Sequence, residues 1–483
     1  MENLQPRPVW AHFAALCAIP RPSGREAAVR DHLLAWARAN AIAARVDAAG
    51  NLILSKPASP GGADLPGVIL QGHLDMVCQA NAGTGHDFEH DPIRPVLRDG
   101  WLVAEATTLG ADNGIGVALA LAALTEPGLV HPALEVLLTV DEEDGMHGAH
   151  GLAPGSLAGH YLINLDSEDW GYFYLGCAGG VDIEVEQPVE RVPMPADRVV
   201  RRITVSGLRG GHSGLDIHLG RGNAIKLLAE AVRELAGQTD LNLIELAGGS
   251  ARNAIPREAW ADVALPAAAT AGLAAWAAAK TAEWRTRFAA GDAGVALACS
   301  PDGTAATGSL APAAQARLLD FLADARDGVA AMSADFPGTV AASDNLGVAA
   351  LTGTAFRATI MARGLADRQT DGLADAIVAQ AAGHGLAARK TGAYPGWTPD
   401  PASPLLARCR AAYAEHFGAE AGLRVIHAGL ECGVLAGSHP GLDMISFGPD
   451  IRGAHAPGEA VEVASVARAW SLLKAVLGAL AQP

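Results

Sequence analysis

The sequence predicts an α/β protein with a central mixed sheet flanked by helices and a second, inserted α+β domain. Its 483 residues are too many for one hydrophobic core, so the chain should divide into two or three domains. In residues 1–182 and 398–483, short apolar strands alternate with helices, and several strands end in His, Asp or Glu. Residues 183–397 contain few such strand ends. We therefore expect residues 1–182 and 398–483 to form one domain, with residues 183–397 inserted as another.

Charge, cysteine content and hydropathy narrow the class of protein. Lys+Arg number 35 against 52 Asp+Glu, and the net charge of −17 argues against nucleic acid or an anionic membrane as a partner. The six cysteines form no Cys-x-x-Cys pair, which fits a reducing cytoplasm. Residues 9–19 are apolar but lack a basic leader, and the Ala-rich residues 259–279 are interrupted by Asp262 and Pro266. We expect a soluble, cytoplasmic protein.

The first elements are predicted to be two helices and a short strand. The helices fall within residues 8–45 and are separated by residues 20–24, where Ser23 and Glu26 have the spacing of a capping box. Residues 51–55 form the short strand.

The next strand, residues 67–75, is predicted to be buried and to end in His73 and Asp75. Side chains two residues apart on a strand point to the same face. One can therefore ligate a metal while the other holds the imidazole ring. The alternative is a hydrogen-bonded core histidine followed by a helix cap.

Asp112 lies near the start of an apolar helix predicted over residues 117–124. Its simplest role is N-capping of that helix. Gly110, Gly114 and Gly116 permit close backbone approach around it, but their spacing is not that of a phosphate-binding loop. Asp112 is therefore a cap or part of a site made with other strand ends.

Residues 134–140 predict a buried strand, and the four carboxylates of residues 141–144 follow it directly. Adjacent anions repel one another and are costly to bury unless a cation neutralises them. Lysine is absent between Lys56 and Lys226, so a divalent metal is the natural partner. The alternative is a solvated acidic turn.

A further apolar strand, residues 161–165, leads directly into Asp166. In an open α/β sheet, ligand sites lie beyond the carboxyl ends of the strands. Three strands that end in histidine and carboxylates therefore predict a metal site. Oxygen and imidazole donors without thiolate suit Zn, Mn or Co better than copper.

The remaining candidates lie in loops and at strand ends. His212 follows a glycine-rich turn, Asn253 precedes the strand 259–265, and a strand over residues 356–363 ends in Arg363. Gly429 lies in the glycine-rich stretch after the strand 423–426, and His455 lies in a loop before the last helix, residues 463–480. A loop histidine could complete the site if the final segment returns to the first sheet.

Taken together, these motifs resemble the dinuclear zinc aminopeptidase/carboxypeptidase superfamily. Within it they are most similar to the aminoacyl-histidine dipeptidase branch, also called Xaa-His or cytosol non-specific dipeptidases. The resemblance runs from about Pro20 to the C-terminus. The motifs are Gly-His-Leu-Asp-Met-Val, Gly-Ala-Asp-Asn-Gly-Ile-Gly, Thr-Val-Asp-Glu-Glu-Asp-Gly-Met, Asn-Leu-Asp-Ser-Glu and Gly-Ala-His-Ala-Pro-Gly-Glu.

The resemblance implies two divalent metal ions, with zinc favoured and cobalt or manganese possible. Asp112 would bridge them, His73 and Asp166 would complete one coordination shell, and Glu143 and His455 the other. It also implies a zinc-peptidase-like catalytic domain, with the inserted domain serving as a lid and dimerisation domain.

The resemblance gives Glu142 and Asp75 the catalytic roles. Glu142 would act as general base on the attacking water, and Asp75 would orient His73. A carboxylate that already donates to a metal is a poor base, so Glu142 and its neighbour Glu143 need separate functions.

The resemblance also indicates four residues that bind substrate. His212 would donate a hydrogen bond to the scissile carbonyl, from its own subunit or a partner's, and Arg363 would bind the substrate's C-terminal carboxylate better than Arg357. Asn253 and the backbone near Gly429 are further candidates. The alternatives are a locally bonded loop histidine and a strand-end surface arginine.

The implied function is a homodimeric metallo-dipeptidase that hydrolyses Xaa-His and related dipeptides. One alternative is an N-acyl amino-acid amidohydrolase or carboxypeptidase on the same scaffold. Another is a non-catalytic metal-binding scaffold protein. A sequence of that kind would be expected to lack Glu142 or one of the metal ligands. A dipeptidase must also bind a free amino terminus, and Asp169 and Glu431 are acidic candidates between which the sequence does not decide.

Overall fold

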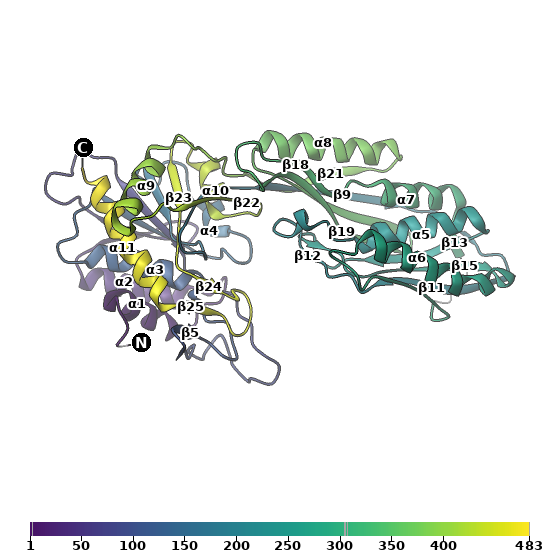
Figure 1. Cartoon of the computed structure of the whole chain (residues 1–483), viewed down its shortest axis with the longest axis horizontal. Helices are drawn as coiled ribbons and strands as arrows, with labels where there is room; N and C mark the ends of the chain where they lie inside the picture. Colours follow the sequence, from purple (N-terminus) through teal and green to yellow (C-terminus); the bar gives the residue numbers. More distant parts are fainter. Residues whose placement is uncertain (2, 304–305, 307, 483) are drawn as a thin grey trace. The chain divides into compact units, whose positions relative to one another are not determined.

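The chain folds into two compact units, each containing one large sheet (Figure 1). The computed structural model describes residues 1, 3–303, 306 and 308–482. Unit 1 comprises Met1–Gly176, Trp397–Val425 and Leu430–Pro483, and unit 2 comprises Cys177–Gly396 and Ile426–Gly429.

Unit 2 begins six residues before the predicted boundary at 182/183. The difference arises because residues 179–188 already form a strand of the second sheet. Unit 2 also includes residues 426–429, a return that the sequence did not predict. The role of unit 2 as a lid or dimerisation domain stays a prediction.

Unit 1 is built on an eight-stranded mixed sheet in the order β1-β2-β6-β3-β7-β23-β8-β22. β6, β3, β7 and β23 are parallel to one another, whereas β1, β2 and β8 run antiparallel to a neighbour. This confirms the predicted mixed α/β class. The strands are β1 (Ala43–Val46), β2 (Leu52–Lys56), β3 (Val68–His73), β6 (Leu134–Thr139), β7 (Tyr161–Asn164), β8 (Tyr172–Cys177), β22 (Gly422–Ile426) and β23 (Asp443–Ser446).

Helices cover this sheet because the sequence buries its parallel strands completely. All six residues of β3 are buried. Helix α3 is apolar on nearly all sides; it packs on β3 and is covered in turn by α1 and α11. The helices are α1 (Arg7–Cys17), α2 (Ala27–Ala39), α3 (Ala111–Thr125), α4 (His147–Gly151), α9 (Pro404–Phe417), α10 (Glu431–Ser438) and α11 (Val463–Leu480).

α11 is the one helix in the described part of the chain that is long and apolar enough to cross a membrane. Half of its apolar window is buried, and it packs on α9 and α3. A core helix passes the same test of length and composition, and the packing identifies α11 as one.

A small four-stranded sheet brings the C-terminal loop to the start of α3. Its order is β24-β25-β5-β4, and the loop that contains His455 joins β24 to β25. The Gly458 N–H donates to the carbonyls of Ala104 and Thr107, which precede α3. The strands are β4 (Val96–Arg98), β5 (Trp101–Val103), β24 (Ile451–Arg452) and β25 (Ala460–Glu462).

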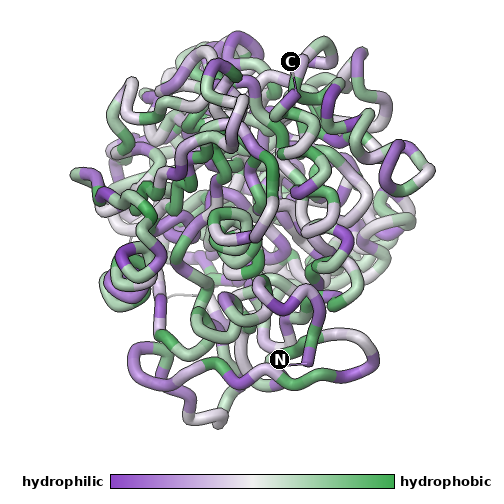
Figure 2. The backbone as a smooth tube through the Cα atoms, turned by 90° about the vertical axis from the view of Figure 1, so that its left-hand side faces the viewer, coloured by the Kyte–Doolittle hydropathy of each residue, from purple (hydrophilic) through white to green (hydrophobic). Residues whose placement is uncertain are grey.

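Unit 2 has a sheet in the order β16-β11-β15-β13-β19-β20-β9-β21, with β18 paired to β19. An apolar core lies between this sheet and its helices, of which α5 packs on β11, β13 and β15 and α8 on β9 and β20. Figure 2 shows that many outlying loops of the chain carry hydrophilic stretches.

The strands of the large sheet in unit 2 are β9 (Gly179–Pro188), β11 (Arg198–Ser206), β13 (Asn242–Gly248), β15 (Ala259–Pro266), β16 (Ala296–Ser300), β18 (Gly328–Met332), β19 (Val340–Thr352), β20 (Ala355–Gly364) and β21 (Ala388–Tyr394). Two short pairs accompany it, β10 (Arg191–Pro193) with β17 (Gly308–Leu310) and β12 (Gly211–His212) with β14 (Ala254–Ile255). The helices are α5 (Ala224–Gln238), α6 (Leu273–Arg287), α7 (Pro312–Asp324) and α8 (Asp367–Gly383). A 3-10 turn, Ala267–Gly272, leads directly into α6.

Candidate metal centre and active site

The five predicted metal ligands meet where three parallel strands end. His73 is the last residue of β3, Glu143 follows β6, and Asp166 follows β7. Asp112 comes from the first turn of α3, and His455 from the loop between β24 and β25. Ligand atoms of His73, Asp112 and Asp166 lie within 4.8 Å of one another, as do those of Asp112, Glu143 and His455.

Asp112 lies between two histidines and presents one oxygen to each. His73 Nε2 is 3.1 Å from Asp112 Oδ1, and His455 Nε2 is 3.1 Å from Asp112 Oδ2. Asp166 Oδ1 lies 3.5 Å from His73 Nε2, and Glu143 Oε2 lies 3.1 Å from His455 Nε2. Two sets of imidazole and carboxylate donors thus share one aspartate.

The donor set fits two divalent cations. Asp166 Oδ1 and Glu143 Oε1 are buried and accept no hydrogen bond from the described residues. A buried carboxylate oxygen without a partner is costly unless a cation faces it. Imidazole and carboxylate donors without thiolate are ligands of Zn, Mn and Co.

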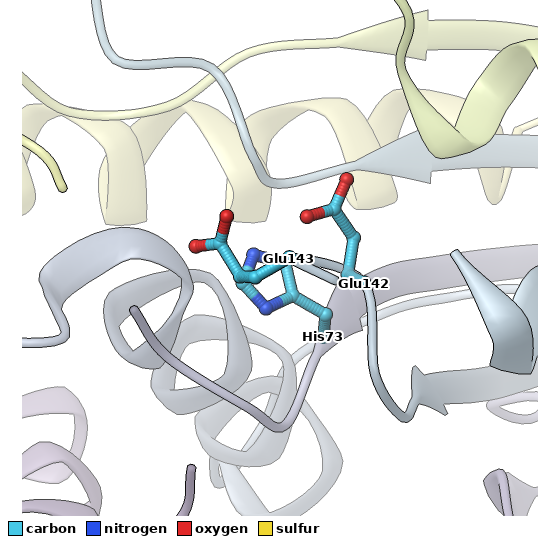
Figure 3. A group of neighbouring side chains, drawn as sticks. All are labelled: His73, Glu142 and Glu143. Carbon is cyan, nitrogen blue, oxygen red and sulfur yellow. The ribbon is translucent and has the colours of Figure 1, made fainter. Parts of the chain in front are cut away.

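Figure 3 shows that the two adjacent glutamates diverge. Their carboxylates lie on different sides of the view, yet one ligand atom from each lies within 4.8 Å of a nitrogen of His73, so these three residues form a further close group. The loop after β6 therefore places Glu143 among the five predicted metal ligands, which we call the cluster, and places Glu142 next to it.

Asp75 holds both His73 and this loop. Its Oδ1 is 3.3 Å from His73 Nδ1 and accepts the Glu142 N–H at 3.1 Å, while Oδ2 accepts the Glu143 N–H at 3.1 Å. Burial opposes ionisation, but hydrogen bonds from His73, Ser23 and the backbone hold the pKa of Asp75 well below its usual value. Because Asp75 faces Nδ1, the Nε2 atom of His73 is left to the cluster.

The predicted capping box is wrong. Ser23 caps no helix; its hydroxyl donates instead to Asp75 Oδ2 at 2.8 Å. Glu26 is itself the residue before α2, and its Oε1 accepts the N–H groups of Gly24 and Asp141. Glu26, Asp75 and Asp141 form another close group of acids, but backbone hydrogen bonds occupy Glu26 and Asp75.

The first turn of α3 is capped by Glu459 and not by Asp112. Glu459 Oε2 accepts the N–H groups of Leu109 (2.7 Å) and Gly110 (3.0 Å), and Oε1 accepts those of Ala111 (2.7 Å) and Asp112 (3.2 Å). Because Glu459 takes these four donors, the Asp112 side chain is free to face the two histidines. Glu459 is 347 residues from Asp112, and sequence reasoning missed it.

Arg21 ties the same turn to the end of β3. Its Nη1 donates to the carbonyls of Leu74 at 2.8 Å and Asp75 at 2.7 Å, and its Nη2 donates to that of Gly110 at 2.5 Å. Gly110 has φ +67°, and a Cβ there would lie 2.4 Å from Arg21 Nη2. This buried arginine was also missed; its Nη1 and Nη2 donate to backbone carbonyls and not to the carboxylates of the metal ligands.

The shifted pKa values of the acids around the predicted metal ligands indicate an excess of negative charge at this site. Burial raises the pKa of Asp166 to about 7 and that of Glu168 to about 8. Burial also raises the pKa of Glu142 well above its usual value, with Glu431 as the strongest carboxylate contributor. Hydrogen bonds to Asp112 and Glu143 raise the pKa of His455 to about 11. Bound divalent cations would relieve this excess.

The predicted substrate-binding residues form a separate group in unit 2. His212 Nδ1 accepts the N–H groups of Gly214 (3.1 Å) and Leu215 (2.9 Å), so the ring proton is on Nε2. Burial, followed by the charge of Arg363, lowers the pKa of His212 to about 4. His212 therefore presents a neutral N–H donor.

The surface-arginine alternative for Arg363 is wrong, because the residue is 4% exposed at the end of β20. Its Nη1 donates to Tyr394 Oη at 2.6 Å, and Nε lacks a partner among the described residues. Asn253 is exposed, and its backbone carbonyl accepts the Ser213 N–H at 2.8 Å. Gly429 ends the short return of the chain into unit 2.

Comparison with known proteins gives a consistent picture. The sequence model of peptidase family M20/M25/M40 matches residues 69–479. A cytosol non-specific dipeptidase of Escherichia coli (strain K12) is 39% identical over 479 residues, covering 99% of this chain and 98% of that protein. The crystal structure of an aminoacylhistidine dipeptidase from Vibrio alginolyticus matches with a TM-score of 0.88 and 41% identity, covering 99% of this chain and 97% of that one.

A more distant structure shares the fold alone. The aminopeptidase PepT from Bacillus cereus ATCC 10987 matches with a TM-score of 0.57 and 17% identity over 99% of this chain and 100% of that one.

The cap on α3 gives a stability prediction. In the wild type, backbone N–H groups donate to both carboxylate oxygens of Glu459. In Glu459→Gln an amide NH2 replaces one of these oxygens, and each buried N–H left unpaired lowers the free energy of unfolding by about 1–3 kcal/mol. We expect a clearly lower thermal midpoint in metal-stripped protein. Glu462→Gln is the control. In its ion pair with Arg468 the side chains are 29% (Glu462) and 38% (Arg468) exposed, so losing the pair should lower the free energy of unfolding by about 1 kcal/mol or less. Equal shifts for both variants would contradict the capping role.

Proposed function

The chain belongs to peptidase family M20/M25/M40, and we propose that it is a metal-dependent dipeptidase acting on Xaa-His and related dipeptides. The observation that carries the proposal is the Asp112 carboxylate, with one oxygen 3.1 Å from His73 Nε2 and the other 3.1 Å from His455 Nε2. The dipeptidase names of the E. coli and Vibrio relatives support this class of substrate.

In this proposal two divalent ions occupy the two donor sets. His73, Asp112 and Asp166 hold one, and Asp112, Glu143 and His455 hold the other, with zinc favoured and cobalt or manganese possible. When bound, the ions lower the pKa of water in the site and polarise the scissile carbonyl.

Glu142 acts as the general base. It takes a proton from the attacking water and delivers it to the leaving amine. The position of Glu142 depends on Asp75, which accepts its backbone N–H at 3.1 Å. Glu143 is held in the same way, and it also lies within 4.8 Å of ligand atoms of Asp112 and His455, so we assign Glu143 to the metal and Glu142 to proton transfer.

Two residues of unit 2 are proposed to bind substrate. Arg363, buried and with an unpaired Nε, binds the C-terminal carboxylate, and a guanidinium can do so with two hydrogen bonds. His212, neutral with its proton on Nε2, donates to the carbonyl oxygen as negative charge develops. Asn253 and the backbone at Gly429 are secondary candidates.

The cellular setting is proposed by analogy. The name of the E. coli relative supports a cytoplasmic enzyme, and family resemblance supports a homodimer in which unit 2 serves as lid and dimerisation domain.

An N-acyl amino-acid amidohydrolase or carboxypeptidase on the same scaffold would differ in needing no free amino group. A non-catalytic metal-binding scaffold would have no use for a base beside the donor set, and Glu142 is present.

Glu142→Gln should lower turnover of L-alanyl-L-histidine by about 10²–10⁴-fold while the metal content stays unchanged, because the ligands remain and the proton acceptor is lost. Hydrolysis is measured after chelation and reconstitution with Zn, Co or Mn, beside metal analysis. Asp144→Asn, which changes an exposed acid of the same loop, is the control and should stay near the wild-type rate.

Three results would contradict this account. Near-normal turnover by Glu142→Gln removes the assigned base. Preference of the wild type for the N-acetylated dipeptide moves the assignment to the amidohydrolase. Activity that survives complete metal removal excludes both.

Arg363→Ala should raise KM for L-alanyl-L-histidine by about 10–100-fold, as expected for loss of a charge-assisted pair worth about 1.5–3 kcal/mol. It should also abolish the wild-type preference for this acid over its C-terminal amide. Arg357→Ala, on the same strand but paired with exposed Glu186, is the matched control and should keep that preference. An unchanged preference in Arg363→Ala would exclude it as the carboxylate ligand.

A further inference from the structure

Glu431 is a fully buried carboxylate that the proposed mechanism does not use. It is the first residue of α10 and is 1% exposed. Its Oε2 accepts hydrogen bonds from Gln71 Nε2 at 2.6 Å and Thr139 Oγ1 at 2.7 Å. Its Oε1 is shielded from solvent and has no hydrogen-bond partner among the described residues. An unpaired oxygen of this kind is costly, and it points to a ligand that is a donor.

A chain of buried side chains across the sheet fixes the orientation of Glu431. Gln71 Oε1 accepts from Asn164 Nδ2 at 2.6 Å, and Asn164 Oδ1 accepts from the Ser446 hydroxyl. These residues lie on the adjacent strands β3, β7 and β23. Because Gln71 uses its oxygen for Asn164, its NH2 group must face Glu431. The sheet therefore holds Oε2 in place and leaves Oε1 for another partner.

Glu431 lies at the closed end of the proposed active site. Thr139, whose hydroxyl donates to Glu431 Oε2, lies opposite His73 in the pairing of β3 with β6, so Glu431 lies next to the strand ends that carry the metal ligands. Side-chain exposure is 1% at His73, 9% at Asp166 and 53% at His455, so the cluster opens to solvent at its other end. Glu431 is not among the residues that group as metal donors.

The chemistry of the substrate matches this position. The part of a dipeptide on the amino side of the scissile bond is a single residue, which ends in an ammonium group with three N–H donors. An ion pair with a carboxylate shielded from water is stronger than one at the surface. The other acidic candidate, Asp169, has a side chain that is 49% exposed, and it is already paired with Arg424 and Tyr174.

We propose that Glu431 Oε1 accepts a hydrogen bond from the substrate's α-ammonium group and so makes a free amino terminus a requirement for cleavage. This inference rests on the proposed dipeptidase function. Glu431 closes the site behind the first residue of the substrate and selects for its positive charge.

The test compares L-alanyl-L-histidine with propionyl-L-histidine, which has the same shape but a hydrogen in place of the ammonium group. The wild type should favour the dipeptide by about 100-fold in kcat/KM, in line with a charge-assisted hydrogen bond of about 3 kcal/mol. In Glu431→Gln, which keeps an oxygen for Gln71 and Thr139, that preference should fall at least about tenfold. The rate on propionyl-L-histidine should change little. Asp169→Asn is the control and should keep the full preference.

Binding supplies a readout that does not depend on turnover. Calorimetry on Glu142→Gln and on the double variant Glu142→Gln/Glu431→Gln should show weaker binding of the dipeptide in the double variant and equal binding of propionyl-L-histidine. Thermal midpoints and metal content check that the fold is retained. Should Glu431→Gln fail to fold, Glu431→Asp, which keeps the charge but shortens its reach, should lower the preference partially.

The outcomes distinguish a failure of the amine-binding role of Glu431 from a failure of the proposed dipeptidase function. Equal losses on both substrates would reduce Glu431 to a structural role, and a loss of preference in Asp169→Asn alone would move the amine site there. Either result overturns the inference while leaving the dipeptidase intact. A wild type that cleaves neither substrate overturns the proposed function itself, and this inference with it.

Discussion

The position of the Asp112 carboxylate between two histidines is the constraint on which the rest of the site depends. Its two oxygens face imidazoles from opposite ends of the chain, so the backbone around Asp112 must be held without using its side chain. Glu459 does this by accepting four successive N–H groups, two just before α3 and two in its first turn, and Arg21 does it by binding the Gly110 carbonyl. An aspartate at the start of a helix often caps the helix with its own side chain. Here Glu459 does so, and the Asp112 side chain is free to face the two histidines.

The parallel strands explain why so much charge can gather at one place. β3, β6 and β7 end at the same edge; β3 ends in His73, and β6 and β7 lead into Glu143 and Asp166. Beneath that edge, the polar side chains of Thr139, Gln71 and Asn164 are linked to one another or to Glu431 by hydrogen bonds. The sheet thus supports the cluster from below, and the loop between β24 and β25 completes it from the other side.

The inserted unit leaves this sheet undisturbed. The chain departs after β8 and returns to add α9, α10, β22 and β23, and β23 pairs in parallel with β7. This return matters for the site because it supplies both Glu431 and the loop with His455.

Local patterns predicted the strands and the acids that follow them, because a buried strand and its end are visible within a dozen residues. The α/β class and the convergence of strand ends that carry His73, Glu142 and Glu143, and Asp166 follow from that information, whereas the choice of Asp112 and Glu143 as ligands came from the family resemblance. His455, 343 residues from Asp112, was suggested by the motif around it and not by periodicity. Arg21 and Glu459 could not be predicted, because they bind backbone groups that any sequence provides. The Ser23 capping box failed for a related reason: tertiary contact with Asp75 outweighed the local signal.

The most direct test of the account is the metal stoichiometry of Asp112→Asn. Metal-stripped wild-type protein titrated with Zn should bind two ions per chain, and Asp166→Asn should retain one tight site, because it belongs to only one donor set. Asp112→Asn should weaken both sites together, since each set depends on one of its oxygens. Two tight sites retained in Asp112→Asn would contradict a shared aspartate and, with it, the proposed centre.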